Sequence, residues 1–180
     1  MPEGRPPKRE EVARILDYLP YGRTADSRSY EKQTIVQAVG EANFVLMEMT
    51  PKEGIVPTAG TRVYIGSGSR DVIDHVNRRI DYLELSNNAK LELSYQIPSI
   101  ILDNEAVFIR YFNEAGPITT RMHALELLPG IGKKLMWAVL NERKKGAFKS
   151  FADLMERVKG LHNPEKIIYK RVEDELMDDK

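Results

Sequence analysis

The segment 129–132, with the sequence Pro-Gly-Ile-Gly, constrains the fold of this chain more than any other feature. Apolar residues stand at matching places on both sides, in 125–128 and 135–139, which predicts two helices joined by a tight turn. We expect glycine at positions 130 and 132 because a side chain there would clash or would block the approach of another backbone. The turn and the start of the second helix would then present free N–H groups at the positive end of a helix dipole, where an anion can bind.

The longer segment 125–140 resembles the helix-hairpin-helix motif, which binds the phosphates of a nucleic acid. The alternative is a turn that simply ends a helix, and a Gly-x-Gly pattern alone would not decide between them. The apolar flanks, the preceding proline and the two lysines after the second glycine together favour a phosphate site. The candidate nucleic-acid-binding residues are Gly130, Ile131, Gly132, Lys133 and Lys134, with Lys144, Lys145, Lys149 and Lys159 as supporting candidates.

Residues 146–161 resemble the second hairpin of tandem helix-hairpin-helix domains. Such domains pair two hairpins about a pseudo-two-fold axis, so that each can contact one strand of a duplex. This second copy departs from the pattern, because His162 stands where a second glycine is expected. We therefore expect either a weaker phosphate contact through Lys159 or a role confined to completing the fold.

The first third of the chain predicts short β-strands. Residues 12–19, 34–39, 44–49 and 61–65 combine β-branched, aromatic and apolar side chains, and a hairpin turn separates the second run from the third. Residues 72–83 fit either a fifth strand or a short helix. Four or five short strands in about 80 residues predict a small closed barrel, and an oligonucleotide-binding (OB) barrel is the preferred interpretation.

From about residue 86 the pattern becomes helical. A first helix is expected to end at Pro98, and Ser99 to begin a second helix that ends near residue 115. Further helices are expected from Thr119 or Thr120 to 128, at 133–143, at 151–158 and at 164–176. The predicted class is α+β, with a small OB-like β-barrel at 1–83, a helical connector at 84–116 and a tandem helix-hairpin-helix domain at 117–180.

The net charge of zero conceals an uneven distribution of charged residues. Residues 116–170 hold 11 basic and 5 acidic side chains, a net charge of +6, whereas residues 71–115 have a net charge of −4. The basic excess therefore accompanies the Pro-Gly-Ile-Gly segment, where phosphate binding needs it. A neutral chain with an acidic middle also suits a module that docks on another protein, and this remains the alternative function.

Several other classes of protein do not fit the sequence. The chain has no cysteine, which excludes disulfides, thiolate metal sites and a cysteine nucleophile. It has no run of about 18 apolar residues, and residues 1–11 do not form a signal peptide, so a cytoplasmic protein is expected. The three histidines do not stand at ligand spacing, so we expect neither a metal nor a cofactor.

Asp153 is a candidate for an enzymatic function. Base-excision glycosylases that contain this hairpin add a catalytic aspartate some twenty residues beyond it, and Asp153 lies at about that distance. Asp153 also stands in the first turn of a predicted helix, where an acid complements the helix dipole. The second interpretation is preferred, and we expect a protein that is not an enzyme.

Aromatic residues of the barrel region would stack unpaired bases if several of them lined one open face beside basic side chains. The alternative is that many of them belong to the core. Trp137 is expected to be a core anchor between helices. The barrel aromatics are Tyr18, Tyr21, Tyr30, Phe44, Tyr64 and Tyr82, with Arg23, Arg28 and Lys32 as the basic partners.

The chain as a whole resembles an archaeal family of uncharacterised proteins, known as domain of unknown function 655 (DUF655). The resemblance lies in residues 16–22, 112–121, 125–134, 150–160 and 163–168. It implies an OB-like barrel joined to a tandem helix-hairpin-helix domain that binds nucleic acid. Phosphate contacts at 130–134 would serve either RNA or DNA without reading its sequence. The resemblance implies no established activity.

Overall fold

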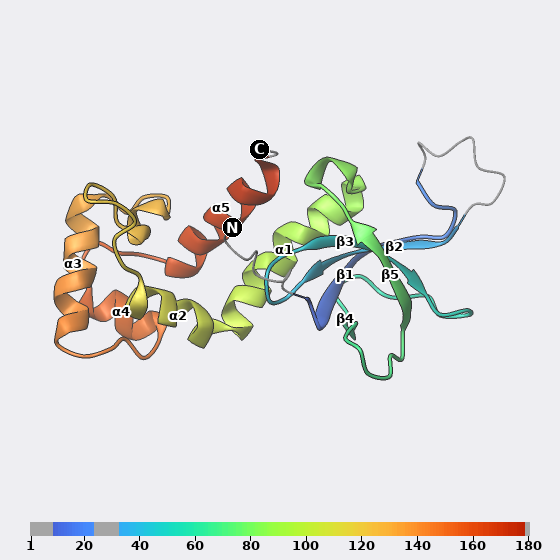
Figure 1. Ribbon diagram of the computed structural model, residues 1–180, viewed down its shortest axis with the longest axis horizontal. Helices are drawn as coiled ribbons and strands as arrows, with labels where there is room; N and C mark the ends of the chain where they lie inside the picture. The colour runs from blue at the N-terminus through green and yellow to red at the C-terminus, as the bar shows by residue number, and fades with distance from the viewer. Residues whose placement is uncertain (1–8, 24–32, 179–180) are drawn as a thin grey trace, which may run out of the picture. The chain divides into compact units, whose positions relative to one another are not determined.

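The structure is a computed structural model that describes residues 9–23 and 33–178 (Figure 1). Its elements belong to two compact units, Met1–Gln96 and Ile97–Lys180. The boundary falls inside helix α1 (Asn87–Asp103), so the residues expected to form a separate connector, 84–116, are shared between both units. The predicted α+β class is confirmed.

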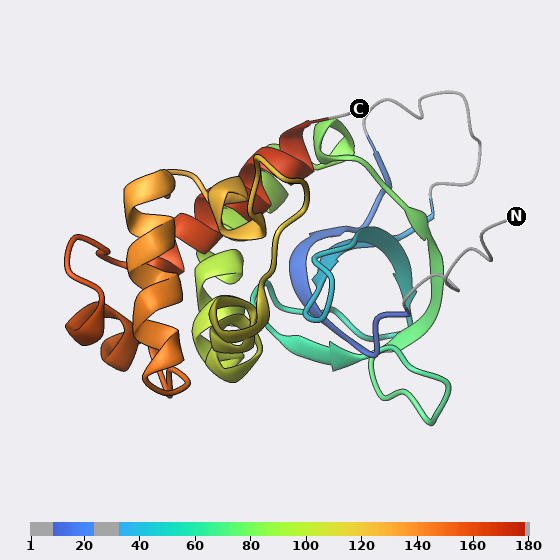
Figure 2. The ribbon, with the colours of Figure 1, turned by 60° about the vertical axis from the view of Figure 1, so that its left-hand side comes forward.

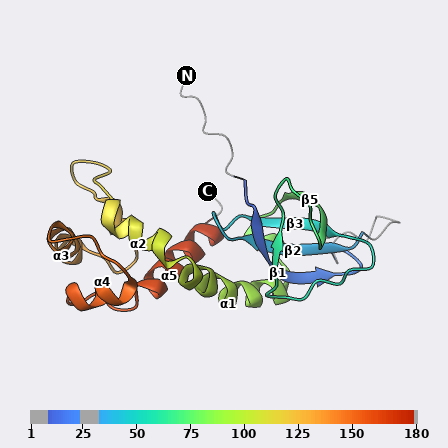
Figure 3. The ribbon, with the colours of Figure 1, turned by 90° about the horizontal axis from the view of Figure 1, so that it is seen from below.

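The first unit contains one antiparallel sheet with the strand order β4-β1-β2-β3-β5. The sheet curls into a half-barrel, as Figure 2 shows, and β1, β2 and β3 run side by side in Figure 3. Register shifts in β1 and along the β3–β5 pair mark bulges, which increase the local twist of a sheet. The strands are β1 (Val12–Leu19), β2 (Ile35–Gly40), β3 (Leu46–Pro51), β4 (Arg62–Tyr64) and β5 (Ile73–Arg79).

The predicted strands are confirmed to within a few residues, but the sheet is not the closed barrel that their number suggested. Strands β4 and β5 are its two edges. Strand β4 has only three residues, and every residue of β5 after Ile73 is exposed. A short strand and a strand that is polar on both faces make poor partners for closure, which explains the half-barrel.

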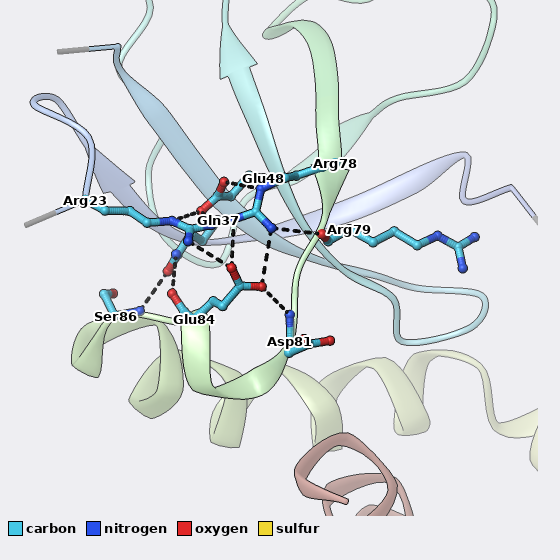
Figure 4. Close-up of polar contacts among 8 residues, drawn as sticks. All are labelled: Arg23, Gln37, Glu48, Arg78, Arg79, Asp81, Glu84 and Ser86. Carbon is cyan, nitrogen blue, oxygen red and sulfur yellow. Dashed lines mark hydrogen bonds and ion pairs between the residues drawn. The ribbon is translucent and has the colours of Figure 1, made fainter. Parts of the chain in front are cut away.

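The concave core of the first unit consists of alternating side chains from all five strands. In β2 the residues between these positions are buried as well, and they include the fully buried Gln37. The Gln37 side chain donates to the carbonyl of Glu84 at 3.0 Å and accepts from the N–H of Ser86 at 2.8 Å. It thereby binds the short helix η1 (Tyr82–Glu84) and the start of α1 to the sheet (Figure 4).

Next to Gln37 lies a compact ion network. Glu48, which is only 4% exposed, pairs with Arg23 and with Arg78, and both arginines also pair with Glu84 (Figure 4). Glu84 is partly exposed, so its own ion pairs add little to the stability of the fold. Removing either arginine, however, would leave the Glu48 carboxylate buried and incompletely paired, which is costly. The network therefore holds strands β3 and β5 against η1.

Helix α1 continues through Pro98 instead of ending there, so the predicted break is wrong. A proline inside a helix costs about 3 kcal/mol. Ile97, Ile100 and Ile101 surround it and are almost completely buried, and each buried isoleucine returns about 1.5–3 kcal/mol. Burial of these three side chains outweighs the local preference of the proline.

The second unit contains the last turns of α1 and five further elements. None of the helices in the described residues is long and apolar enough to span a membrane. The predicted helices at 133–143, 151–158 and 164–176 are confirmed. The elements are α2 (Glu105–Glu114), η2 (Ala124–Leu127), α3 (Lys133–Lys144), α4 (Phe151–Arg157) and α5 (Pro164–Met177).

The predicted helix from Thr119 or Thr120 to 128 is wrong, because only the single 3₁₀ turn η2 forms there. Residues 117–123 form a loop, hereafter the 117–123 loop, closed by a β-bridge between Pro117 and His123. The hydroxyl of Thr119 accepts from the N–H groups of Arg121 and Met122 at 3.2 and 3.1 Å. A threonine that bonds its own neighbouring backbone in this way competes with a helix.

Candidate nucleic-acid interface

The Gly130 turn (residues 128–132) has the conformation that the glycine pattern predicts. Gly130 has φ +85°, a region that glycine adopts without strain. The N–H of Ile131 donates to the carbonyl of Leu128 at 3.1 Å, and both of these side chains are buried. The turn is therefore held by one hydrogen bond and by two apolar anchors.

Gly130 and Gly132 do not avoid a steric clash, contrary to the expectation from the sequence. A Cβ atom added at Gly130 or at Gly132 would meet nothing within 4 Å, so the expected clash is absent at both positions. Gly132 has φ −91° and ψ −173°, a conformation that any residue adopts. The positive φ at position 130 favours glycine there. At position 132 any residue could adopt the backbone conformation, and the effect of glycine is to leave open space in front of helix α3.

The N-terminus of helix α3 has no side-chain cap. Gly132 is its N-cap residue, and the first intrahelical hydrogen bond runs from Met136 N–H to the Gly132 carbonyl at 2.9 Å. The N–H groups of the first three helical residues have no acceptor inside a helix, and Gly132 has no side chain to supply one. These groups and the positive end of the helix dipole are available to an external anion.

The two lysines directly after Gly132 have different surroundings. The Lys133 ammonium donates to the carbonyl of Arg121 at 2.6 Å and pairs with the Glu126 carboxylate at 2.9 Å. Lys133 therefore attaches α3 to the 117–123 loop and is partly neutralised. Lys134 is exposed and makes no ion pair within the described residues. The unshared positive charge beside the helix terminus is that of Lys134.

Helix η2, which precedes the turn, is fixed by a reciprocal cap. The Nδ1 atom of buried His123 accepts from the N–H of Leu125 at 3.1 Å, and the Glu126 carboxylate accepts from the N–H of His123 at 2.8 Å. That backbone hydrogen bond, and after it the bond from Lys133, lowers the pKa of Glu126. Burial, with a smaller contribution from Arg143, lowers the pKa of His123. The cap therefore consists of a charged Glu126 and a neutral His123 near pH 7.

The Gly160 turn (residues 158–162) has the same geometry as the Gly130 turn. Gly160 has φ +92°, and the N–H of Leu161 donates to the Val158 carbonyl at 3.3 Å. Val158 and Leu161 are buried, as Leu128 and Ile131 are in the first turn. A Cβ atom on Gly160 would lie 3.4 Å from the Leu135 side chain, so this turn lies beside the start of α3.

The helix after the Gly160 turn begins differently. Asn163 is the N-cap residue of α5 in a left-handed conformation with φ 47°, and it makes no side-chain cap. Pro164 occupies the first helical position and has no N–H to offer. Lys159 is exposed and has no ion pair in the described part of the chain. The N–H of Lys166 also donates to the Asn163 carbonyl, at 2.9 Å. The second turn thus leaves two backbone donors fewer free than the first.

Two of the remaining candidates lie at the opposite end of α3 from the Gly130 turn. Lys144 and Lys145 lie at the end of α3, about 16 Å along the helix from Lys133. Lys145 pairs with Glu142 at 2.7 Å. Lys149 is exposed on the connection to α4, which Arg157 fixes by donating to the carbonyls of Glu142 and Gly146 at 2.6 and 2.7 Å.

A groove of about 590 Å³ lies between α3 and the 117–123 loop. The sequence did not predict it. Its charged lining residues are all basic: Arg121, Lys133, Arg143 and Lys144. Its aromatic lining residue is Trp137, which is 55% exposed. Trp137 is therefore not the core anchor that was expected. Its spacing of four residues from Lys133 was the available signal, because such residues share a helix face.

The barrel aromatics are divided between core and surface. Tyr18 packs against the sheet core, whereas Tyr21 and Tyr64 are exposed. Arg23, an expected partner for stacked bases, is instead paired with Glu48 and Glu84. Three of the residues proposed for stacking lie outside the described residues: Arg28, Tyr30 and Lys32.

A second hollow, of about 580 Å³, lies in the first unit between the loop after β4 and strand β5. Its lining mixes Arg70 and Arg79 with Glu10 and Glu11. The Glu10 carboxylate accepts from the N–H groups of Ala42 and Asn43 at 2.9 and 2.7 Å and so shapes the β2–β3 turn. The mixed charge makes this hollow less suited to a polyanion than the groove beside α3.

Comparison with known proteins identifies the family of the chain. The family model described as "Protein of unknown function (DUF655)" matches residues 9–180. The uncharacterized protein MJ0038 of Methanocaldococcus jannaschii is 49% identical over 178 residues, which cover 99% of this chain and 79% of that protein. The crystal structure of Af1531 from Archaeoglobus fulgidus, titled with the same family model, matches with a TM-score of 0.84 and 46% identity over 94% of each chain. The chain therefore belongs to the DUF655 family.

Proposed function

We propose that this protein binds the phosphate backbone of RNA or DNA at the Gly130 turn, without catalysing a reaction. The observation that carries the proposal is the uncapped start of α3, where Gly132 leaves open space before the N–H groups of the first helical turn. Exposed Lys134 adds a full charge at the same place. Backbone N–H groups and a lysine bind phosphate, which every nucleotide carries. This binding therefore does not depend on the base sequence.

We interpret the two turns as a tandem helix-hairpin-helix. The support is their shared conformation, since each has a glycine at positive φ between two buried apolar residues. We likewise interpret the half-barrel as an OB-type sheet, which has five strands and is partly open. In this interpretation the Gly130 turn binds phosphate, and the Gly160 turn mainly completes the fold.

Asp153 supports the non-enzymatic part of the proposal. Its carboxylate accepts from the N–H of Lys149 at 2.9 Å and from Arg157 at 3.3 Å, and its own N–H donates to the Ser150 hydroxyl at 3.0 Å. The hydrogen bond from Lys149, and after it the contact with Arg157, lowers the pKa of Asp153. These are the bonds of a residue at the start of a helix, which is the preferred interpretation of Asp153.

The test is fluorescence anisotropy with labelled single- and double-stranded DNA and RNA at low and moderate salt. The variant is Lys134→Glu, because reversing Lys133 would instead place two carboxylates side by side at Glu126. Arg110→Glu, at an exposed position on α2, is the control with the same change in charge. We expect binding that weakens with salt and falls about tenfold in Lys134→Glu, with little change in the control. Binding that both variants leave unchanged would contradict the proposal.

A protein-docking function is the second candidate, and a specific observation favours it. Leu91 and Tyr95 lie one turn apart on α1, and both are exposed. An apolar docking surface of this kind would be insensitive to salt. Absence of binding to all four nucleic-acid probes, together with salt-insensitive capture of a protein that Leu91→Ser abolishes, would favour this function instead.

A further inference from the structure

The chain has a single tryptophan, Trp137. Trp137 lies in the middle of α3 and is more than half exposed, although a large aromatic side chain is usually buried over most of its surface. Buried Met136 and Val139 show which face of α3 packs into the unit. Trp137 stands on another face, together with Lys133 and Lys144, because these three residues are separated by four and seven positions.

The groove beside this face is preformed. The Lys133 ammonium holds the 117–123 loop through the Arg121 carbonyl at 2.6 Å, and the β-bridge between Pro117 and His123 closes the base of the loop. Arg143 donates to the carbonyls of Phe112 and Ala115 at 3.2 and 2.7 Å, so its position is fixed. A rigid wall on each side reduces the entropy that a ligand must lose on binding.

The lining of the groove indicates the chemistry of its ligand. All of its charged side chains are basic, which favours a polyanion, and its volume of about 590 Å³ is within the range of small-molecule sites. An exposed indole beside cations is the combination that binds an unpaired base and its phosphate. In a duplex the faces of the bases are already stacked on one another, so an aromatic side chain reaches them only in a single strand or an extruded nucleotide.

We propose that the groove between α3 and the 117–123 loop binds an unpaired nucleotide of a single-stranded nucleic acid, with its base stacked on Trp137. The Gly130 turn holds a neighbouring phosphate of the same strand, and Lys144 contacts the strand at the other end of α3. The inference rests on the proposed function and makes it more specific, because it names single-stranded nucleic acid as the preferred ligand.

The experiment uses the intrinsic fluorescence of Trp137, which has no background from another tryptophan. The full-length protein is titrated with single-stranded DNA and RNA of about 12 nucleotides, the corresponding DNA duplex, and an abasic DNA strand with the same number of phosphates. We expect both single strands that contain bases to quench the emission at the concentrations at which anisotropy shows binding. We expect the duplex and the abasic strand to leave it unchanged.

Substitution of Trp137 separates stacking from charge. We expect Trp137→Ala to weaken single-strand binding about 5- to 100-fold and to leave binding of the abasic strand unchanged, whereas Trp137→Phe should retain most of the affinity. Circular dichroism checks that each variant is folded, which its exposed position favours. Single-strand binding without quenching, or with unchanged affinity in Trp137→Ala, overturns this inference and leaves the proposed function standing. No binding of any probe in anisotropy overturns both.

Discussion

The Gly130 turn and the Gly160 turn share one backbone conformation but lead into helices that begin differently. Each has a glycine at positive φ, one closing hydrogen bond and two buried apolar residues. After the first turn, Gly132 opens α3 without a side chain. After the second, left-handed Asn163 and Pro164 open α5. The glycine and its apolar neighbours therefore specify the turn, whereas the next two or three residues decide whether it exposes donors to an anion.

The largest effect is expected from Gly132→Asp, compared with His162→Asp at the corresponding place in the second turn. Gly132 has the extended conformation of a good N-cap, so an aspartate there would accept from the first N–H groups of α3 and stabilise the helix by roughly a few tenths of a kcal/mol. It would also occupy the site of a phosphate and repel it. We expect nucleic-acid affinity to fall about 10- to 100-fold.

His162→Asp adds nearly the same charge to the Gly160 turn, where Pro164 has no N–H to offer a phosphate. We expect this variant to change the affinity for nucleic acid by less than about threefold. Anisotropy measures binding and urea denaturation measures stability for both variants. A loss in binding that accompanies a loss in stability for Gly132→Asp would indicate an unfolded helix rather than a blocked site. Equal losses in both variants would remove the functional difference between the two turns.

A smaller effect, on stability alone, tests the shared conformation. Gly130→Ala and Gly160→Ala each force alanine into the left-handed region, which costs about 1–2 kcal/mol. An added Cβ meets open space at Gly130 and ordinary contact with Leu135 at Gly160, so neither variant adds a clash. We expect similar losses in the free energy of unfolding, measured by urea denaturation. A loss at one glycine but not at the other would show that the two turns do not share a conformation.

The smallest effect concerns pH and the cap that precedes the Gly130 turn. Burial lowers the pKa of His123 below its usual value of about 6.5 in the folded protein. Between the lowered pKa of His123 in the folded protein and its usual pKa in the unfolded chain, the folded state therefore binds fewer protons. The contribution of His123 to stability is complete above about pH 6.5 and is lost as the pH falls below it.

The variant His123→Asn keeps an acceptor for the N–H of Leu125 and cannot titrate. We expect it to flatten the dependence of unfolding free energy on pH below about 6.5, measured by urea denaturation at several pH values. The matched control is His162→Asn, which changes an exposed histidine in the second turn. A curve that His162→Asn flattens as much as His123→Asn does would contradict the assignment.

Much of the fold was determined by the sequence itself, where local preferences and burial agree. The run of β-branched and apolar residues at 12–19 gave a strand with the same bounds as β1. Pro164 marked the first residue of α5, because a proline fits that position without losing a hydrogen bond. Gly130 marked the turn before α3 because positive φ favours glycine over every other residue.

The tertiary structure decided the features in which packing opposes local preference. Buried isoleucines carried α1 through Pro98, and the bonds of Thr119 with its neighbours replaced an expected helix by a loop. That loop formed the second wall of the groove, so the exposure of Trp137 could not be read from the helical pattern alone. Periodicity shows which residues share a helix face, but only the positions of the neighbouring elements determine whether that face is covered.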